Sequence, residues 1–294
     1  MLAGMHWISL TLLSAFFLAT ADTLSKHYLS HYRPGELVLV RFGVSGALLL
    51  PLLLWQPWPT LSATFWGWVA VSIPLELLAM WLYMQAIRGS PLSLTLPYLA
   101  FTPIFNTLTG YILLGETVTW TGFSGIVLVV LGAWLLNLET ATNGSGLNVL
   151  APFRAITRER GSRLMLIVAA IYSLTSVTSK GALLHVTPGF FGPFYFAVLA
   201  IASALLFASR DVSSWRAAGK NPWAHLAIGA FMAGMVVTHF YAIAHIEVAY
   251  MVAVKRTSLL FGMLYGAWLF RETGLKKNFA AGVMMVLGVF LIVA

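Results

Sequence analysis

The sequence predicts an all-α membrane protein with ten transmembrane helices, arranged as two inverted repeats of five helices each. Three observations predict this fold. Hydrophobic residues make up 60% of the chain and charged residues only 9%, whereas a soluble domain carries about 25% charged residues. Apolar stretches near the ~20 residues that a bilayer-crossing helix needs recur along the chain. The two halves of the chain also share residue patterns, which indicates a duplication.

The duplication is clearest where each half ends. The stretch Gly125–Leu136 reads GIVLVVLGAWLL, and Ala281–Ile292 reads AGVMMVLGVFLI. Further back, Thr23–Lys26 is echoed by Val177–Lys180 at nearly the same offset. Because each half holds five spans, an odd number, the second copy must enter the bilayer from the opposite face. Inverted repeats of this kind are typical of secondary transporters, which work by alternating access.

The individual spans follow from the apolar runs. Continuous runs exclude barrel strands, which need alternation of apolar and polar residues. Helices remain, because lipid offers no partner to an open backbone. We place the spans at residues 7–28, 36–54, 65–87, 92–114, 119–138, 163–185, 189–208, 223–244, 248–270 and 275–293.

Two domains are expected from these spans. The first repeat covers residues 1–138 and the second covers residues 163–294, joined by a cytoplasmic connecting loop at residues 139–162. The loop contains the run Asn143–Gly146 followed by several arginines, which predicts a flexible stretch before a short basic surface helix.

The basic residues predict the orientation of the chain. The net charge of +8 would suggest nucleic acid in a soluble protein. Here the loops that follow odd-numbered spans hold Lys and Arg, and the loops that follow even-numbered spans hold none. This bias places the odd loops in the cytoplasm and both termini outside it. We therefore expect a multi-pass protein of a bacterial inner membrane, with the lipid bilayer and no nucleic acid as a partner.

Several functional classes are disfavoured by what the sequence lacks. There is no cysteine, so disulfides, thiolate metal sites and cysteine nucleophiles are excluded. The sequence shows no metal-ligand spacing of histidines and no HExxH, GxSxG or Walker A motif. We expect no enzyme activity, metal, cofactor or self-contained ATP-driven pumping. Residues Met1–His6 carry no Lys or Arg, so a cleavable signal peptide is not expected either.

Ionisable residues inside the spans are candidate functional groups, because each costs ~2.5–3.5 kcal/mol near the bilayer centre. In the deduced topology Glu76 and Lys255 lie at similar depth, so we expect them to face one cavity and pair. Arg256 follows Lys255 at an angle of ~100° around the helix, so only one of the two can point straight inward. We assign substrate contact to Lys255 first. The alternative is a purely structural role for both cations.

Other charges have simpler interpretations beside their functional ones. Asp22 and Lys26 are four residues apart and can neutralise each other along one helix face. Lys26 and its repeat counterpart Lys180 are expected to snorkel to the headgroups, or else to act as reciprocal gates, and Lys180 is also a candidate substrate-binding residue. Glu36 and Arg41 are expected to form an interfacial pair or to contact lipid. His239 is a candidate proton carrier along with Glu76 and Asp22, and its alternative role is a hydrogen-bonded packing residue.

Prolines and aromatic residues complete the candidate site. Pro74, just before Glu76, and Pro103 in the fourth span remove backbone donors and are expected to disturb their helices. Broken helices often border transporter binding sites. Aromatic side chains expected to line the path include Trp81, Tyr83 and Tyr98.

Small residues in the ninth span indicate close helix packing. The GxxxG pattern Gly262–Gly266 is expected to serve contacts within the chain. A dimer interface is the alternative interpretation, and a monomer is expected.

Each repeat also carries a Gly-rich helix and a glutamate, in the runs Leu113–Glu116 (LLGE) and Leu269–Glu272 (LFRE). In this pattern the chain resembles the EamA family of the drug/metabolite transporter superfamily, although Arg271 stands where the pattern usually has Gly. The resemblance implies a basket of helices around a central cavity, with spans five and ten packed at the periphery. It also implies export of amino acids or other metabolites.

These observations favour a secondary transporter of a small polar metabolite. Lys255 and Arg256 favour a substrate that bears a carboxylate or phosphate, with amino acids and related solutes as the leading class. A flippase for a lipid-linked anionic headgroup is the second hypothesis. Multidrug export of cations ranks lower, because a cation prefers an acidic cavity. A channel would not need the inverted duplication.

Overall fold

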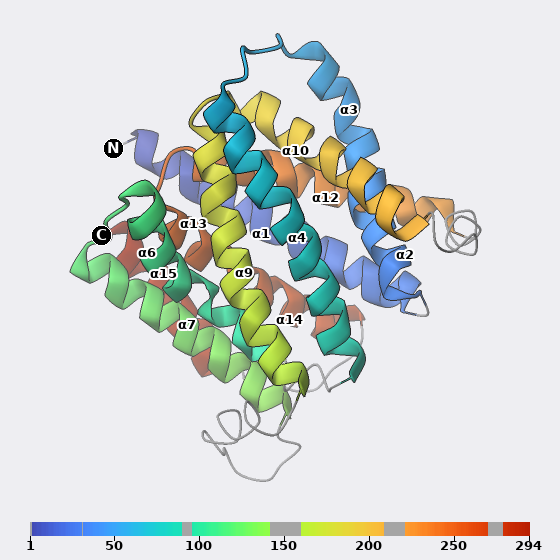
Figure 1. Ribbon diagram of the computed structural model, residues 1–294. Helices are drawn as coiled ribbons and strands as arrows, with labels where there is room; N and C mark the ends of the chain where they lie inside the picture. The colour runs from blue at the N-terminus through green and yellow to red at the C-terminus, as the bar shows by residue number, and fades with distance from the viewer. Residues whose placement is uncertain (1, 31, 90–95, 142–159, 209–220, 270–278) are drawn as a thin grey trace. The chain divides into compact units, whose positions relative to one another are not determined.

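A computed structural model of the protein describes residues 2–30, 32–89, 96–141, 160–208, 221–269 and 279–294. All its regular elements are helical in these segments (Figure 1). From the first half come α1 (Leu2–Leu29), α2 (Pro34–Val38), the π-helical η1 (Leu39–Val44), α3 (Ser45–Trp55), α4 (Ala63–Gly89), the 3₁₀-helical η2 (Leu96–Phe101), α6 (Thr102–Leu114) and α7 (Trp120–Ala141). From the second half come α9 (Arg160–Leu183), α10 (Pro188–Ser203), η3 (Ala204–Ala208), α12 (Pro222–Ile243), α13 (Val248–Lys255), α14 (Ser258–Leu269) and α15 (Phe279–Val293).

The helices agree with a protein that crosses the membrane several times. Six stretches within the described segments are long and apolar enough to do so: His6–Leu29, Gly35–Trp55, Ala63–Tyr83, Arg160–Leu183, Pro188–Leu206 and Pro222–Ile243. Shorter apolar helices cover Tyr98–Leu114, Trp120–Leu135 and Phe279–Val293. The expected ninth span is divided into α13 and α14.

Hydroxyl side chains in α1 show how a membrane helix accommodates polar residues. Thr11, Thr23 and Ser25 are buried. Each donates its hydroxyl proton to the carbonyl four residues earlier, at 2.7, 2.8 and 2.7 Å respectively. These bonds satisfy the hydroxyls within the helix. Helix α1 packs along α12.

The described chain forms two compact units that differ from the two halves of the sequence. The first unit comprises Met1–Leu77 and Thr178–Ile246, and the second comprises Leu78–Val177 and Glu247–Ala294. Each unit therefore contains helices from both repeats. Helices α4 and α9 contribute to both units, since each runs without interruption across a unit boundary.

Glycines in α7 and α15, of the second unit, reveal the symmetry of the duplication. A Cβ at Gly125 would lie 2.6 Å from the carbonyl oxygen of Gly288, and one at Gly132 would lie 2.8 Å from that of Ala281. The sequence alignment equates Gly125 with Ala281 and Gly132 with Gly288, so exchanging the repeats exchanges the two contacts. Rising numbers in α7 meet falling numbers in α15, so these equivalent helices are antiparallel. An inverted repeat requires this arrangement.

The first unit contains contacts of a related kind between α3 or η1 and α10. At the offset that equates Lys26 with Lys180, Gly46 corresponds to Ala200 and Phe42 to Phe196. A Cβ at Gly46 would lie 2.7 Å from the Cβ of Ala200, and the rings of Phe42 and Phe196 are 5.7 Å apart. Residues that touch their own counterparts are what a two-fold relation between repeats produces.

Candidate substrate site

The ninth span is interrupted at the cation pair that the sequence analysis singled out. Helix α13 ends at Lys255 and α14 begins at Ser258. The backbone N–H of Arg256 donates to Ala253 at 3.0 Å, and that of Thr257 donates to Val254 at 3.0 Å. These bonds span three residues rather than the four of an α-helix, so the chain tightens before it resumes. The expected continuous span at residues 248–270 was wrong in this respect.

The break changes the electrostatics around the two cations. The end of α13 carries a partial negative charge, which Lys255 in its last turn complements. The first amides of α14 are already bonded, since the N–H groups of Leu259 and Leu260 donate to Arg256 at 3.0 Å and to Thr257 at 2.9 Å. Half-helix ends of this kind hold substrates and ions in transporters. The break therefore brings a helix carboxyl end and two side-chain cations into a few consecutive residues.

Arg256 occupies an environment suited to an anion. Its side chain is half-buried, and among the described residues its buried Nε has no hydrogen-bond partner. The guanidinium interacts electrostatically with the phenol groups of Tyr172 on α9 and Tyr83 on α4. Tyr83 was expected at the site from the sequence, and Tyr172 was not. A desolvated arginine beside hydroxyl groups is ready to bind a carboxylate or phosphate oxygen.

Asn106 on α6 is a second polar group in the same unit that needs a partner. It is 1% exposed, and within the described part of the chain neither its amide nitrogen nor its amide oxygen has a hydrogen-bond partner. Burying an amide in this way costs ~1–3 kcal/mol. Gly110, one turn further on the same helix face, lies beside Glu116, which binds the first residue of α13. Helix α13 also packs along α6, the helix that carries Asn106.

Comparisons with known proteins can now be set beside this geometry. The sequence profile of the EamA-like transporter family matches residues 5–138 and 160–294. This chain belongs to the EamA-like transporter family. The family predicted from the LLGE and LFRE runs is thereby confirmed.

Two further similarities are more limited. The EamA-like chain is 32% identical over 71 residues to the probable 4-amino-4-deoxy-L-arabinose-phosphoundecaprenol flippase subunit ArnE of Enterobacter sp. (strain 638). The match covers 24% of this chain and 66% of that subunit, somewhat less than two thirds of its length. A solved crystal structure shares the fold at a TM-score of 0.67 and 18% identity, covering 99% of this chain and 94% of its own.

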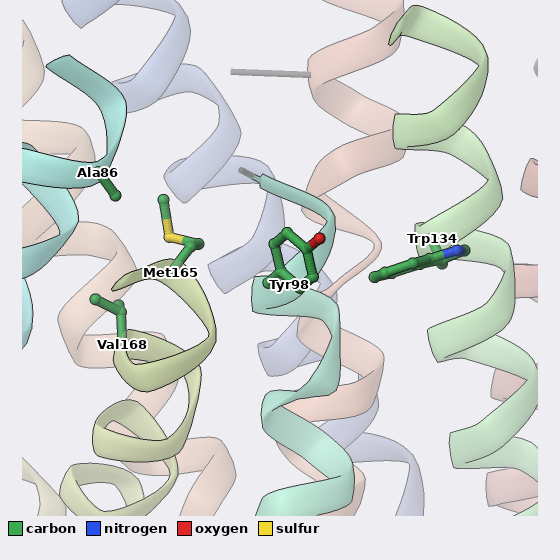
Figure 2. Close-up of a cluster of buried hydrophobic side chains, with 5 residues drawn as sticks. All are labelled: Ala86, Tyr98, Trp134, Met165 and Val168. Atoms are coloured by element: carbon green, nitrogen blue, oxygen red, sulfur yellow. The ribbon is translucent and has the colours of Figure 1, made fainter. Parts of the chain in front are cut away.

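Two predicted site residues of this EamA-like transporter, Tyr98 and Trp81, differ in their surroundings. Tyr98 is fully buried, in a cluster that Figure 2 shows together with Trp134, Ala86, Met165 and Val168. The rings of Tyr98 and Trp134 are 5.5 Å apart, edge to face. Tyr98 thus packs η2 against α7 instead of facing an open path. Trp81 on α4 is 47% exposed.

The charges of the first unit are paired differently from the sequence expectation. The carboxylate of Asp22 forms an ion pair with Arg41, and Arg41 also approaches the hydroxyl of Ser25 at 3.4 Å. Lys26 was the expected partner of Asp22, and Glu36 that of Arg41. Glu36 instead accepts a hydrogen bond from the backbone N–H of Arg33 at 2.7 Å. This bond caps the first turn of α2 and stabilises the helix start.

The two lysines at equivalent repeat positions have different environments. Lys180 is only 8% exposed, and its Nζ donates to the carbonyl of Ile246 at 2.6 Å. Lys26 is exposed. Snorkelling of Lys180 to the headgroups was therefore wrong for the described state, because its amine is held by the protein backbone.

The expected roles of His239, Glu76 and Asp22 as proton carriers remain predictions. His239 is half-buried on α12, and its ring lies 5.0 Å from that of Phe240, which agrees with a packing role. Glu76 is half-buried on α4 in the first unit, whereas Lys255 belongs to the second. Their pairing stays a prediction.

No group of three or more His, Asp or Glu residues able to hold a metal ion occurs within the described segments.

Proposed function

We propose that this EamA-like protein is a secondary transporter of small anionic or zwitterionic metabolites, with amino acids and related carboxylate-bearing solutes as the leading class. One observation carries the proposal: the Nε of Arg256, at the break between α13 and α14, is buried and has no hydrogen-bond partner among the described residues. Transport proceeds by alternating access of an inverted-repeat fold. The antiparallel packing of α7 against α15 supports that fold.

The chemistry of the break supports an anionic substrate. Lys255 and Arg256 supply positive charge and side-chain donors. Tyr83 and Tyr172 offer hydroxyls next to the guanidinium. A purely cationic solute would be repelled there, so export of cationic drugs is disfavoured.

A flippase for a lipid-linked anionic headgroup is the second candidate. The similarity to a stretch of the ArnE flippase subunit favours it. Its substrate carries an anionic phosphate that the same arginine suits. The two candidates share the chemistry of the bound group and differ in whether a lipid tail accompanies it.

Transport by purified protein in liposomes tests the proposal. Labelled amino acids, organic acids and phosphates are offered with and without a pH gradient, in parallel with a fluorescent lipid bearing an anionic sugar-phosphate headgroup. Uptake of a soluble anionic or zwitterionic solute above the protein-free level supports the first candidate. Translocation of the lipid alone supports the second. Uptake of neither, or of cations alone, contradicts the proposal.

Variants of Arg256 connect the activity to the site. Arg256→Gln is expected to lower kcat/KM by ~10-fold or more, because a hydrogen bond to a charged group contributes ~1.5–3 kcal/mol. Arg256→Lys should lose less, since it keeps the charge but not the planar fork. The matched control is Arg163→Gln, which removes the same charge from the exposed start of α9. Equal effects of Arg256→Gln and Arg163→Gln would contradict the assignment.

A further inference from the structure

The connection between α12 and α13 is held by two charged side chains, one on either side of Glu247. The Nζ of Lys180 donates to the carbonyl of Ile246 at 2.6 Å. The backbone N–H of Val248 donates to Oε2 of Glu116 at 2.9 Å. The first bond lies within the first compact unit and the second within the second, and the chain passes between the units at Ile246–Glu247. Each of the two hydrogen bonds therefore fixes one side of the Ile246–Glu247 connection within a single unit.

The Gly–Glu run of the first repeat is shaped to place Glu116. Helix α6 ends at Gly115, whose φ of 69° lies in the left-handed region that favours glycine. The turn is closed by bonds from the N–H of Gly115 to Tyr111 at 3.1 Å and from that of Glu116 to Gly110 at 3.2 Å. A Cβ at Gly110 would lie 3.0 Å from Oε2 of Glu116. Both glycines thus serve the position of one carboxylate.

A second hydrogen bond joins the loop between α6 and α7 to α13. The backbone N–H of Thr119 donates to the hydroxyl of Tyr250 at 2.8 Å. Gly122 leaves room for that tyrosine, because a Cβ there would lie 2.2 Å from its hydroxyl oxygen. Glu116 and Tyr250 thereby fix the first turn of α13 to the loop that follows α6. The carboxylate also complements the partial positive charge of the helix amino end.

Helix α13 is only eight residues long, so fixing its start also fixes its end. That end carries Lys255 and Arg256. Ile246, on the other side of the connection, is also fixed. The buried ammonium of Lys180 has a carbonyl in place of water as its hydrogen-bond acceptor, and losing that acceptor would be costly.

We propose that Glu116 and Lys180 are positioning residues of transport: Lys180 fixes the end of the first unit at Ile246, and Glu116 fixes the start of α13 in the second unit and so sets where that helix presents its terminal cations. The inference rests on the proposed function for the role of Arg256. It assigns Glu116 the role of a hydrogen-bond acceptor, in contrast to that of a proton carrier. The amide oxygen of glutamine can accept the same bond, so the two roles make opposite predictions for one variant.

The test compares Glu116→Gln with Glu116→Ala, and Lys180→Arg with Lys180→Met, in purified protein and in liposomes. Hydrogen–deuterium exchange of the segment 246–256 measures how firmly the start of α13 is fixed, without any substrate. Glu116→Ala is expected to speed exchange in the first turn of α13 by ~10-fold, whereas Glu116→Gln keeps most of the protection. Glu247→Gln, which alters the charge between the two bonds but neither bond, is the control and should leave exchange unchanged.

Transport supplies the second readout. Glu116→Ala and Lys180→Met are expected to raise KM by ~10-fold for a transported anion, while Glu116→Gln keeps KM within ~3-fold and leaves the pH profile unaltered. Glu116→Gln as inactive as Glu116→Ala, or an unchanged exchange rate in Glu116→Ala, would overturn the proposal. If the unmodified protein transports none of the solutes, the proposed function fails, and the exchange experiment still decides whether Glu116 fixes the start of α13. Lys180→Arg and Glu116→Gln keep the test informative if the more drastic variants do not fold.

Discussion

Three cations in the membrane segments are stabilised in three different ways. The ammonium of Lys180 donates a hydrogen bond to a backbone carbonyl, and Arg41 pairs with the carboxylate of Asp22. Arg256 has tyrosines beside it and a buried Nε that no described residue binds. A buried cation is costly unless something compensates it. The first two have compensation that is already in place, and Arg256 is the one whose remaining donor suits a substrate.

The buried amide of Asn106 leads to a prediction about a single residue. Replacing its unsatisfied amide by the apolar side chain in Asn106→Leu should raise the melting temperature in detergent, because it removes a desolvation cost of ~1–3 kcal/mol. The same change should reduce the shift in melting temperature that a transported anion produces. Asn106→Asp is the contrasting variant and should destabilise the protein, since it buries a charge. A lower melting temperature for Asn106→Leu would show that the amide is structurally satisfied.

Sequence reasoning found some of these residues and missed others. Arg256 and Tyr83, whose roles at the site stay predictions, were singled out because a charge, or an aromatic residue with a hydroxyl, is conspicuous in an apolar span. Tyr172 and Asn106 were missed, because neither carries a charge and each reads as an ordinary residue of its helix. The Asp22–Arg41 pair was missed because it joins two helices, and the spacing of residues along one helix favoured Lys26 instead.

At the scale of elements, the two helices that the duplication equates most clearly are also in close backbone contact. The alignment of Gly132 with Gly288 came from the sequence, and the antiparallel contact that these residues make came from the structure. The tight approach needs glycine, since an added Cβ at Gly288 would lie 2.7 Å from the carbonyl oxygen of Gly125. Small residues are the usual means of close packing between membrane helices.

Substitution of this glycine tests the contact between α7 and α15. Gly288→Ala should lower the melting temperature by several degrees, because inserting a methyl group into a packed contact costs ~1–3 kcal/mol. Gly262→Ala is the matched control, since a Cβ there would meet nothing within 4 Å. It should leave the melting temperature unchanged. Equal stability of both variants would contradict the close contact.

The GxxxG run of the ninth span was expected to serve contacts within the chain. Its two glycines differ, because the described surroundings of Gly262 are open whereas Gly266 is buried. Pro74 was expected to disturb its helix, but α4 continues from Ala63 to Gly89. The break after Lys255 could not be predicted, because no proline or glycine lies at residues 255–257. Such features are set by tertiary packing more than by local propensity.

At the scale of the whole molecule, the sequence identified the family and the duplication. It did not reveal that the compact units combine helices from both repeats. The expected domains at residues 1–138 and 163–294 describe how the chain is duplicated, whereas the units describe how its helices pack. The succession of apolar and polar segments along the chain shows where the helices lie in the sequence, but not which helices become neighbours. The exchange of helices between repeats therefore had to come from the structure.

The absence of cysteine makes the central claim directly accessible to measurement. Ser258, the first residue of α14, is half-buried at the break. A single cysteine in Ser258→Cys can be treated with a membrane-impermeant thiol reagent from either side of sealed vesicles. We predict modification from both sides, as alternating access requires, and slower modification when a transported anion is present. Absence of modification from both sides, or a rate that no anionic solute or lipid headgroup alters, would contradict a substrate site at the break between α13 and α14.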